Sequence, residues 1–593
     1  MRNTDIAKPD YFHKVVDCQW ACPTHTNVPE YIRMIAAGRY TDAFMLNWYS
    51  NVFPGILGRT CDRPCEPACR RMRVEGEPVA ICRLKRVAAD LKDDIHQFIP
   101  EVPKKKNGKR IALIGAGPAS LTVARDLLPL GYETVLFDQD AQGGGMMRTQ
   151  IPAFRLPVGV LDEEVNLVLD MGVECRFGER IDSLKDLLAD GFDAVFIGTG
   201  APRGRDLDIP GRAEADANIH IGVDWLASIA FGHTTSVGKH VVVVGGGNTA
   251  MDCCRSALRL GGKEVYVTVR SGFEEMKAHP WEKEEALAED LPILNWHNPH
   301  SFVTKNGRLT GMRFDKVRAE YTDGRRKLIP TGEQVELPCD DALLAIGQDA
   351  VFPWIEPELG IEIADNGLPV LDPVTFESTR PGVFFGGDAA LGPDNIVSAA
   401  AHGHAAAISI DLYCRGKDLH GERLPPGLNL VSQKMGIHEW GYGNDYDEAK
   451  RVRVPHAKKS DALANIKVEV ELGYDVERAI EESARCLNCD IQTVFTPKLC
   501  IECDACVDIC PMDCINFTAN GEEEELRARL RVPAADKAQD VYVDGPLPTG
   551  RIMAKDENLC LHCGLCAERC PTGAWDMQKS TIHLPQAGGV CWE

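Results

Sequence analysis

From residue 111 onward, the order of apolar and polar residues predicts a strand, a glycine turn, a helix and a second strand. Ile111 to Ile114 form a short apolar run, which is typical of a strand buried in a parallel sheet. The run ends at Gly115-x-Gly117-x-x-Ser120, where a helical pattern begins, and a second strand from Glu133 to Phe137 ends at Asp138. Glycines at such a turn let the backbone approach a pyrophosphate closely, and an acid after the second strand can bond a ribose hydroxyl. The pattern predicts a dinucleotide-binding fold, with Ser120 at a position where Gly or Ala is usual.

The same order of elements returns later in the chain. Val241 to Val244 is a strand pattern, and Gly245, Gly247 and Ala250 then occupy the fingerprint positions. The next strand ends at Arg270, where an acid would favour NAD. An arginine there can pair with the 2′-phosphate of NADP, so the pattern favours NADP(H). The alternative is NAD(H), with Arg270 an ordinary surface residue.

Two later segments complete the outline of a flavoprotein. Phe384 to Asp388 predicts a strand and a turn, and Asn395 to Val397 leads into a helix expected to begin near Ser398. An acid at such a turn can bond a ribityl chain, while the helix N-terminus faces the O2 side of a flavin. Two further strands are expected to end at Gly198-Thr199-Gly200 and at Ala345 to Gln348, the two junctions between the nested domains. We expect an FAD domain over residues 109–235 and 350–416, interrupted by an NAD(P) domain over residues 236–349.

Patterns outside the nucleotide folds are weaker. Pro29 to Asn47 predicts a helical stretch within an N-terminal domain of residues 1–98, and a Pro/Lys-rich linker follows. Residues 417–460 are polar and predict a long connector over the flavoprotein surface. Val468 to Leu487 predicts a helix, so residues 417–494 form a linker and a helix. Residues 518–550 predict an exposed loop in a C-terminal domain of residues 495–593.

Cysteines in the C-terminal domain spell C-x2-C-x2-C-x3-C-P twice. In this spacing three thiolates hold one corner of a [4Fe–4S] cluster, and the fourth cysteine reaches the other cluster. One predicted ligand set is Cys500, Cys503, Cys506 and Cys570, and the other is Cys560, Cys563, Cys566 and Cys510. Two full copies with both prolines disfavour disulfides or zinc. Residues 495–580 resemble bacterial two-cluster ferredoxins.

Bulk composition narrows the class of protein. A chain of 593 residues with 44% apolar content is expected to form about three to five globular domains. The polar start of the sequence does not resemble a signal peptide, so its 23 cysteines point to metal ligands in a cytoplasmic protein rather than to disulfides. A net charge of −23 argues against nucleic acid as a partner. There is no uninterrupted apolar run of about 18 residues, so no membrane span is expected.

Three motifs carry a specific resemblance. GGGMMRTQIPAFRLP (Gly143 to Pro157), GGGNTAMD (Gly245 to Asp252) and EEMKAHPWEKEEA (Glu274 to Ala286) resemble the glutamate synthase small subunit family. That family includes the N-terminal half of dihydropyrimidine dehydrogenase and the flavin subunits of NADPH-linked ferredoxin oxidoreductases. The resemblance covers residues 15–415 and implies an FAD reduced by NAD(P)H, with iron–sulfur clusters near the flavin. The family often has two arginines where this chain has Val269 and Arg270, a departure that weakens the preference for NADP(H).

Fingerprints and resemblance together give a set of predicted cofactor-binding residues. They are Gly115, Gly117, Ser120, Asp138, Gly144, Arg148, Gly200, Gly387, Asp388, Val397, Gly245, Gly247, Asn248, Thr249, Ala250, Arg270 and Gly347. No acid–base side chain is expected to be essential. His279 could approach the nicotinamide, but a structural role is the simpler reading.

The N-terminal cysteines extend the resemblance. In the family this region binds two [4Fe–4S] clusters, and its first ligands are a C-x2-C pair that this chain lacks before Cys18. ESARCLNC at Glu482 to Cys489 resembles that missing motif, moved beyond the flavoprotein. Following the family's pairing, the first predicted ligand set is Cys18, Cys69, Cys486 and Cys489. The second is Cys22, Cys61 and Cys65, with Cys82 or a nearby group as the fourth ligand.

Other readings of these cysteines stay open. Cys486 and Cys489 could bind zinc or face solvent, and Cys82 could be a core thiol. The family's non-cysteine ligand matches a position near Lys85 or Arg86, neither of which is a plausible iron ligand. Seven cysteines are left over: 175, 253, 254, 339, 414, 514 and 591. The vicinal pair Cys253–Cys254 lies in a helical pattern and is expected in the core, so thiol–disulfide reduction is disfavoured.

We expect an α/β multidomain fold, with a helical N-terminal iron–sulfur domain, nested Rossmann-like FAD and NAD(P) domains, and a C-terminal α+β two-cluster ferredoxin domain. The expected function is an NAD(P)-linked electron-transfer subunit with FAD and four [4Fe–4S] clusters. Its partner would be a soluble ferredoxin or another subunit of a cytoplasmic redox complex, such as a 2-oxoacid:acceptor oxidoreductase or a formate-, hydrogen- or aromatic-reducing module. The alternatives are a glutamate synthase small subunit and, from another class, a non-catalytic iron–sulfur adaptor or redox sensor.

Overall fold

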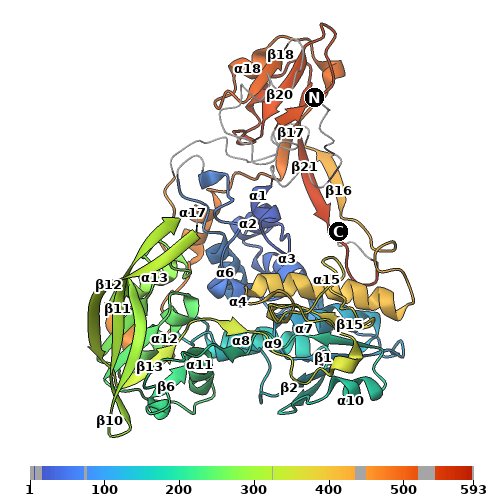
Figure 1. The fold of residues 1–593 in the computed structure, drawn as a ribbon. Coiled ribbons are helices and arrows are strands. Elements are labelled where there is room, and N and C mark those ends of the chain that lie inside the picture. The colour runs from blue at the N-terminus through green and yellow to red at the C-terminus, as the bar shows by residue number, and fades with distance from the viewer. Residues whose placement is uncertain are drawn as a thin grey trace. The chain divides into compact units, whose positions relative to one another are not determined.

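The structure is a computed structural model that describes residues 6, 8, 16–72, 76–322, 325–433, 449–518, 541–557 and 559–589. These residues form two compact units (Figure 1). One comprises Met1–Ile99, Gly421–Val454 and Gly473–Glu593, and the other comprises Pro100–His420 and Pro455–Leu472. Cys591 and most of the predicted loop at 518–550 lie outside the described residues.

The second unit contains two parallel five-stranded sheets, as expected for nested nucleotide folds. The first has the order β15-β4-β1-β2-β3 and is fully parallel. Its strands are β1 (Arg110–Ile114), β2 (Glu133–Asp138), β3 (Glu174–Phe177), β4 (Ala194–Ile197) and β15 (Val383–Phe385). The helices of this part are α7 (Pro118–Leu127), α8 (Met146–Thr149), α9 (Val158–Leu169), α10 (Leu184–Ala189), α14 (Asp388–Leu391) and α15 (Ile396–Cys414). Because β15 joins β4 only after the second sheet is complete, the FAD-type fold is interrupted as predicted.

The second sheet has the order β6-β13-β7-β8-β9. Its strands are β6 (Ile219–Ile221), β7 (His240–Val244), β8 (Glu264–Val269), β9 (Ile293–Asn295) and β13 (Asp341–Leu344), with helices α11 (Gly222–Ala230), α12 (Asn248–Arg259) and α13 (Pro280–Ala288). β6 pairs with β13, so this sheet begins before residue 236, the boundary expected from the sequence. Cys253 and Cys254 are fully buried in the core beneath α12, as expected for core thiols.

Shorter elements complete this unit. The antiparallel strands β10 (His297–Lys305), β11 (Arg308–Thr322) and β12 (Arg325–Pro338) form a long ribbon sheet (Figure 1). β5 (Arg203–Gly204) pairs with β14 (Gln348–Asp349). These strands lie in the two segments by which the chain passes from one nucleotide fold to the other, so their pairing joins those segments. The helix α16 (Lys459–Ala464) lies in the segment that returns to this unit.

The N-terminal part of the first unit is helical. Its helices are α1 (Asp17–Trp20), α2 (Val28–Ala36), α3 (Tyr40–Asn51), α4 (Pro54–Thr60) and α6 (Ile81–Leu91). The stretch predicted at Pro29 to Asn47 is two helices, because the chain turns at Gly38 with φ +72°. The helix predicted at Val468 to Leu487 is shorter than expected: α17 spans Val476–Ser483, and the Asp475 side chain caps it by accepting from the Arg478 N–H.

The C-terminal part of the first unit has two small antiparallel sheets, β16-β21-β17 and β18-β20-β19. The elements are β16 (Gly427–Ser432), β17 (Ile491–Phe495), α18 (Ala505–Asp508), β18 (Ile515–Thr518), β19 (Val541–Val543), β20 (Ile552–Asp556), α20 (Leu565–Arg569) and β21 (Trp575–His583). Within the segment 417–460, predicted as a long connector over the flavoprotein surface, β16 instead pairs with β21 of the C-terminal part over six residues. Residues 434–448 of that connector are outside the described residues.

Candidate nucleotide and iron–sulfur sites

The first glycine turn has the geometry that a dinucleotide requires. Gly115 has φ +93°, and a Cβ there would lie 2.6 Å from the Gly198 carbonyl oxygen. Gly117 caps α7, so the N–H groups of the helix start point toward the turn. The Asp138 carboxylate accepts from the Ala116 N–H at 2.6 Å, which brings the acid to the same turn. Burial raises the pKa of Asp138 above its ordinary value.

A second wall of this site comes from the segments after β4 and β15. Gly387 has φ +61° and begins α14, and Asp388 follows it. Burial raises the pKa of Asp388 to about 6. The helix predicted near Ser398 begins at Ile396, with Val397 buried in its first turn. Met146 approaches Gly200, whose φ is +69°.

Polar atoms at this turn suit a bound FAD. Among the described residues, the Thr199 hydroxyl, the His402 Nδ1 and the Ser120 hydroxyl are buried and have no hydrogen-bond partner. Gly145 also lies against the turn, because a Cβ there would be 2.8 Å from the Gly117 Cα. Arg148 is engaged within its own segment, donating to the Gly143 carbonyl and to Asp162. It therefore shapes the wall of the site, on which Gly144 also lies.

The second glycine turn is also formed. Gly245 has φ +146°, and a Cβ there would lie 2.1 Å from the Ala345 carbonyl oxygen. Gly247 caps α12, and a Cβ there would meet no heavy atom within 4 Å, so the backbone is open to a ligand. Arg270 follows β8 and is exposed. The remaining predicted residues here, Thr249, Ala250 and Gly347, lie at the start of α12 and after β13.

Asn248 and His279 tie two helix starts together. The Asn248 side chain accepts from the His279 N–H at 3.0 Å, and the Ala278 N–H donates to the Gly246 carbonyl at 2.9 Å. The His279 ring stacks on Trp281 with centroids 4.7 Å apart. These contacts give His279 a structural role and fix α13 against the glycine turn.

Four cysteines from both ends of the chain line one cavity of the first unit: Cys18, Cys69, Cys486 and Cys489. Apolar side chains, including Val28, Ile32 and Ile81, complete its wall. Burial raises the pKa of the Cys18 and Cys489 thiols well above the ordinary value. The structure thus brings together the composite set that the resemblance implies, and Cys489 does not face solvent.

The second N-terminal set is also brought together. Hydrogen bonds from the Cys61 and Cys65 thiols lower the pKa of Cys82 well below its ordinary value. Lys85 is buried next to the whole group: burial alone would lower its pKa, but four nearby thiols raise it. Those thiols belong to Cys61, Cys82, Cys22 and Cys65. Cys82 therefore lies next to Cys61 and Cys65, while Lys85 supplies a positive charge that the sequence patterns did not predict.

The ferredoxin-like part groups its cysteines in the crossed manner that the spacing predicts. One cavity is lined by Cys500, Cys503, Cys506 and Cys570, and the other by Cys510, Cys560, Cys563 and Cys566. The second cavity also contains Cys514, whose Sγ lies 3.4 Å from that of Cys510. Cys514 is a fifth thiol that the spacing did not assign to a site.

A backbone turn recurs at these cavities. The residue two positions after a cysteine has positive φ, and its N–H donates to that cysteine's sulfur. This holds for Arg63 after Cys61, Glu502 after Cys500, and His562 after Cys560, with N···S distances of 3.4, 3.3 and 3.4 Å. Asn488 has φ +49°, and its backbone N–H lowers the pKa of Cys486 against the larger opposing effect of burial. N–H···S bonds stabilise thiolates and tune clusters, so the Cys486 turn has the same geometry as the ferredoxin turns.

Two buried residues that no sequence pattern pointed to link the composite cavity to the ferredoxin-like part. His562 Nδ1 lies 3.1 Å from the Cys489 carbonyl oxygen, and its Nε2 lies 3.2 Å from Glu557. The Arg70 guanidinium donates to the carbonyls of Glu557 and Cys560, both at 2.6 Å. The grouped thiols and the N–H···S bonds at these sets fit [4Fe–4S] clusters.

Comparisons with known proteins identify the family of the chain. Family models match for pyridine nucleotide-disulphide oxidoreductase (residues 109–403), for dihydropyrimidine dehydrogenase domain II with a 4Fe-4S cluster (12–97), and for a 4Fe-4S dicluster domain (499–574). The chain is 35% identical to the NADP(+)-dependent formate dehydrogenase subunit beta of Moorella thermoacetica, over 80% of this chain and 70% of that protein. It is 32% identical to the NADPH-Fe(3+) oxidoreductase subunit beta of Geobacter sulfurreducens, over 82% and 77%. It is 31% identical to the glutamate synthase [NADPH] small chain of Escherichia coli, over 66% and 87%. In the described part of the chain, no helix is long and apolar enough to cross a membrane.

Proposed function

Because the chain belongs to the pyridine nucleotide-disulphide oxidoreductase flavoproteins that carry a dihydropyrimidine dehydrogenase-type 4Fe-4S domain and a 4Fe-4S dicluster domain, we propose that it is the NAD(P)-linked electron-transfer subunit of a larger redox complex. It passes electrons between NAD(P)(H), FAD, four [4Fe–4S] clusters and a partner oxidoreductase or ferredoxin. The partner is a 2-oxoacid:acceptor oxidoreductase or a formate-, hydrogen- or aromatic-reducing module. Two relatives that match most of the chain are named beta subunits, one of a formate dehydrogenase and one of an Fe(3+) oxidoreductase.

The chain's own residues bind and orient the cofactors. When bound, FAD would supply the conversion between the two-electron chemistry of NAD(P)H and the one-electron chemistry of the clusters. The turns at Gly115 and Gly387 hold FAD, and the turn at Gly245 holds the nicotinamide nucleotide. Arg270 selects NADP(H) by pairing with its 2′-phosphate. The cluster ligands are the three sets of cysteines that line cavities and the N-terminal set of Cys22, Cys61 and Cys65, which Cys82 completes.

One observation carries the four-cluster proposal: Cys486 lies in the composite cavity on a turn like those of the ferredoxin cysteines. A solvent-facing pair would not require this turn. Asn488 adopts φ +49° there, a left-handed conformation that asparagine enters more readily than most residues. The turn therefore disfavours a solvent-facing thiol at Cys486, and the match of residues 12–97 to a 4Fe-4S domain favours a cluster over zinc.

Two alternatives are disfavoured by particular features. A glutamate synthase small subunit does not need the ferredoxin-like part, and the match to that relative covers 66% of this chain. A non-catalytic adaptor or sensor would not need intact nucleotide turns. Both Gly115 and Gly245 have space only for hydrogen, which is the feature of a working pyrophosphate turn.

Anaerobic titration of the purified protein with NADH and, separately, NADPH tests the proposal, with iron and flavin measured on the same sample. The expected result is about sixteen irons and one FAD per chain, with NADPH the more effective reductant. About eight irons would remove both N-terminal clusters from the proposal, and no bleaching by either nucleotide would favour the adaptor.

A further inference from the structure

The segment from Gly143 to Pro157 physically joins the two nucleotide folds. At its start, the Gly144 N–H donates to the Ala116 carbonyl at 2.9 Å, within the first glycine turn. At its end, Arg155 reaches two helices of the second fold. A short stretch of chain thus contacts the turn assigned to FAD and the helices assigned to NAD(P).

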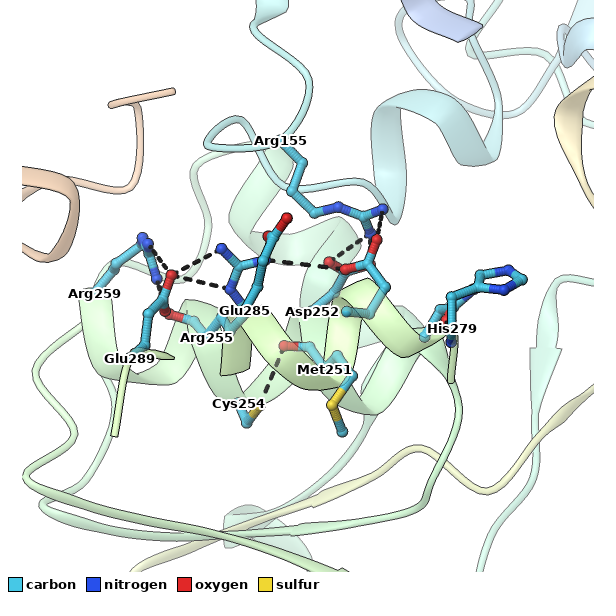
Figure 2. A network of polar contacts seen from close by, with 11 residues as sticks. Arg155, Met251, Asp252, Cys254, Arg255, Arg259, His279, Glu285 and Glu289 are labelled. Carbon is cyan, nitrogen blue, oxygen red and sulfur yellow. Dashed lines mark hydrogen bonds and ion pairs between the residues drawn. The ribbon is translucent and has the colours of Figure 1, made fainter. Parts of the chain in front are cut away.

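Arg155 holds one carboxylate from each of those helices (Figure 2). Its guanidinium donates at 2.8 Å to both oxygens of Asp252 on α12, and it also donates to Glu282 on α13. The three side chains are 13%, 6% and 3% exposed, so the contacts are shielded from water. Nη1 makes both bonds to Asp252 and Nη2 makes the bond to Glu282, so the rigid planar guanidinium fixes the two carboxylates relative to each other.

The residue before Arg155 binds the same face of α12. The Phe154 ring is fully buried, and the guanidinium carbons of Arg255 and Arg259 lie 4.8 and 4.0 Å from its centroid. Asp252, Arg255 and Arg259 are spaced three and four residues apart, so they lie along one side of the helix. Phe154 and Arg155 therefore hold α12 along its length.

Ion pairs continue this network across α12 and α13 (Figure 2). Arg255 pairs with Glu285 and Glu289, and Arg259 pairs with Glu289. Three guanidinium groups thus face four carboxylates, counting Glu282. These pairs lock the two helices to each other, whereas Arg155 is the cation of this set that comes from the other fold.

α12 begins at the glycine turn of the second fold, and that start determines where a nicotinamide nucleotide lies. Asp252 is one helical turn beyond Asn248, and Asn248 is tied to the start of α13 through the His279 N–H. A shift of α12 relative to Arg155 would move the glycine turn with it. The position of the second nucleotide relative to the first therefore depends on the Arg155 contacts.

We propose that Arg155 is a positioning residue: its bonds to Asp252 and Glu282 set the distance and angle between the NAD(P) glycine turn and the FAD turn, and so the geometry of hydride transfer. This inference rests on the proposed function. The three sequence motifs that carry the family resemblance meet here, since Arg155, Asp252 and Glu282 each belong to a different one. A misplacement of about 1 Å costs about 100-fold in rate when reacting atoms must meet in one geometry.

Arg155→Ala tests the proposal, with Arg155→Lys as the conservative variant and Arg318→Ala as the matched control. Arg318 is an exposed arginine on β11, 68% accessible, whose pairing with Glu320 is at the surface. Four quantities are measured on each: FAD content, NADPH dissociation constant, rate of flavin bleaching per FAD-loaded molecule at saturating NADPH, and unfolding temperature of the FAD-free protein. The last is repeated on Asp252→Asn and on the double variant with Arg155→Ala.

The expected result is a split between binding and rate. FAD content and NADPH affinity of Arg155→Ala stay at the wild-type values, whereas the bleaching rate falls about 100-fold. Arg155→Lys loses about tenfold, because an ammonium cannot hold both carboxylates in a fixed plane. Added guanidinium ion restores part of the Arg155→Ala rate. The unfolding temperatures of the two single variants are non-additive, as expected for a direct contact.

Other results would overturn the proposal. An Arg155→Ala rate equal to that of Arg318→Ala, per FAD-loaded molecule, would show that Arg155 serves stability alone. Additive unfolding temperatures would show that Arg155 and Asp252 do not couple. If Arg155→Ala does not fold, Arg155→Lys and Asp252→Asn carry the test with the same readouts. A wild-type protein that neither nucleotide bleaches would instead refute the proposed function before any variant is compared.

Discussion

Arg485 is the residue whose removal most directly tests the composite cysteine set. It directly precedes Cys486, and its side chain is 1% exposed. The guanidinium donates to the carbonyls of Glu77, Pro78 and Ala449 at 2.8, 2.9 and 2.7 Å, and to Glu482 at 2.8 Å. These bonds hold the segment with Cys486 and Cys489 against the N-terminal residues after Cys69.

The free-energy cost of Arg485→Ala comes from the buried acceptors that lose their hydrogen-bond donor. Glu482 is fully buried, and its other oxygen accepts from the Val452 N–H at 2.7 Å. Removing one partner of such a pair leaves an uncompensated buried charge and costs about 3–5 kcal/mol. The carbonyls that lose a donor add about 1 kcal/mol or more each. The total is a large part of the stability of a typical domain, so the segment is expected to detach locally.

Detachment would remove Cys486 and Cys489 from the cavity. We therefore expect Arg485→Ala to lose about four of about sixteen irons, while FAD content is unchanged because the flavin turns lie in the other compact unit. Iron analysis, flavin analysis and thermal unfolding measure these quantities on one preparation.

Arg478→Ala is the matched control on the neighbouring helix. Arg478 is on α17, pairs with Asp475 and has a side chain that is 46% exposed, so its loss should cost about 0–1 kcal/mol and no iron. If Arg485→Ala keeps all its iron and unfolds at the same temperature as Arg478→Ala, the argument that this buried pair builds the composite site is wrong.

Three further changes give separate outcomes. Arg270→Ser should weaken NADPH binding about 10- to 100-fold through the lost charge-assisted bond, with NADH binding unaffected; equal effects on both nucleotides would contradict the assignment. Gly115→Ala should abolish FAD binding, because its Cβ would lie 2.6 Å from the Gly198 carbonyl oxygen, whereas the control Gly159→Ala meets no atom within 4 Å and should retain FAD. Burial raises the pKa of Asp252 from 3.8 to about 6, so its contribution to stability is present below pH 3.8 and is lost as the pH rises through 6. Relative to Asp252→Asn, the wild-type protein should thus become less stable over that range in pH-dependent unfolding, and a constant difference would contradict this.

Local patterns predicted the fold where one short stretch of sequence determines the structure. The strand at Ile111, the turn at Gly115 and the acid at Asp138 lie within one strand–helix–strand unit, so their order alone identifies the fold. The crossed cysteine groups were predicted for the same reason, because ligand spacing in a ferredoxin is local.

Prediction failed where tertiary contacts decide the outcome. The strand β6 has three residues, too few to show a period, and it exists because β13 pairs with it. β16 is a short strand in a mostly polar segment, and its partner β21 lies far along the chain. Arg155 was visible inside a motif, but nothing in one sequence indicates that its partners are Asp252 and Glu282.

The ends of the chain are joined by protein contacts as well as by cysteines. Arg33 donates to Asp490 at 2.8 Å, and Lys579 pairs with Glu30 at 2.6 Å. Closing a loop costs only about 0.6 kcal/mol for each doubling of its length, so a separation of 457 residues adds about 3 kcal/mol to the cost of closing a loop of about ten residues. A few buried bonds such as those of Arg485 can offset that cost. We therefore expect these polar contacts and the binding of the composite cluster to hold the two segments together jointly, because the free energy of binding the cluster is also folding free energy.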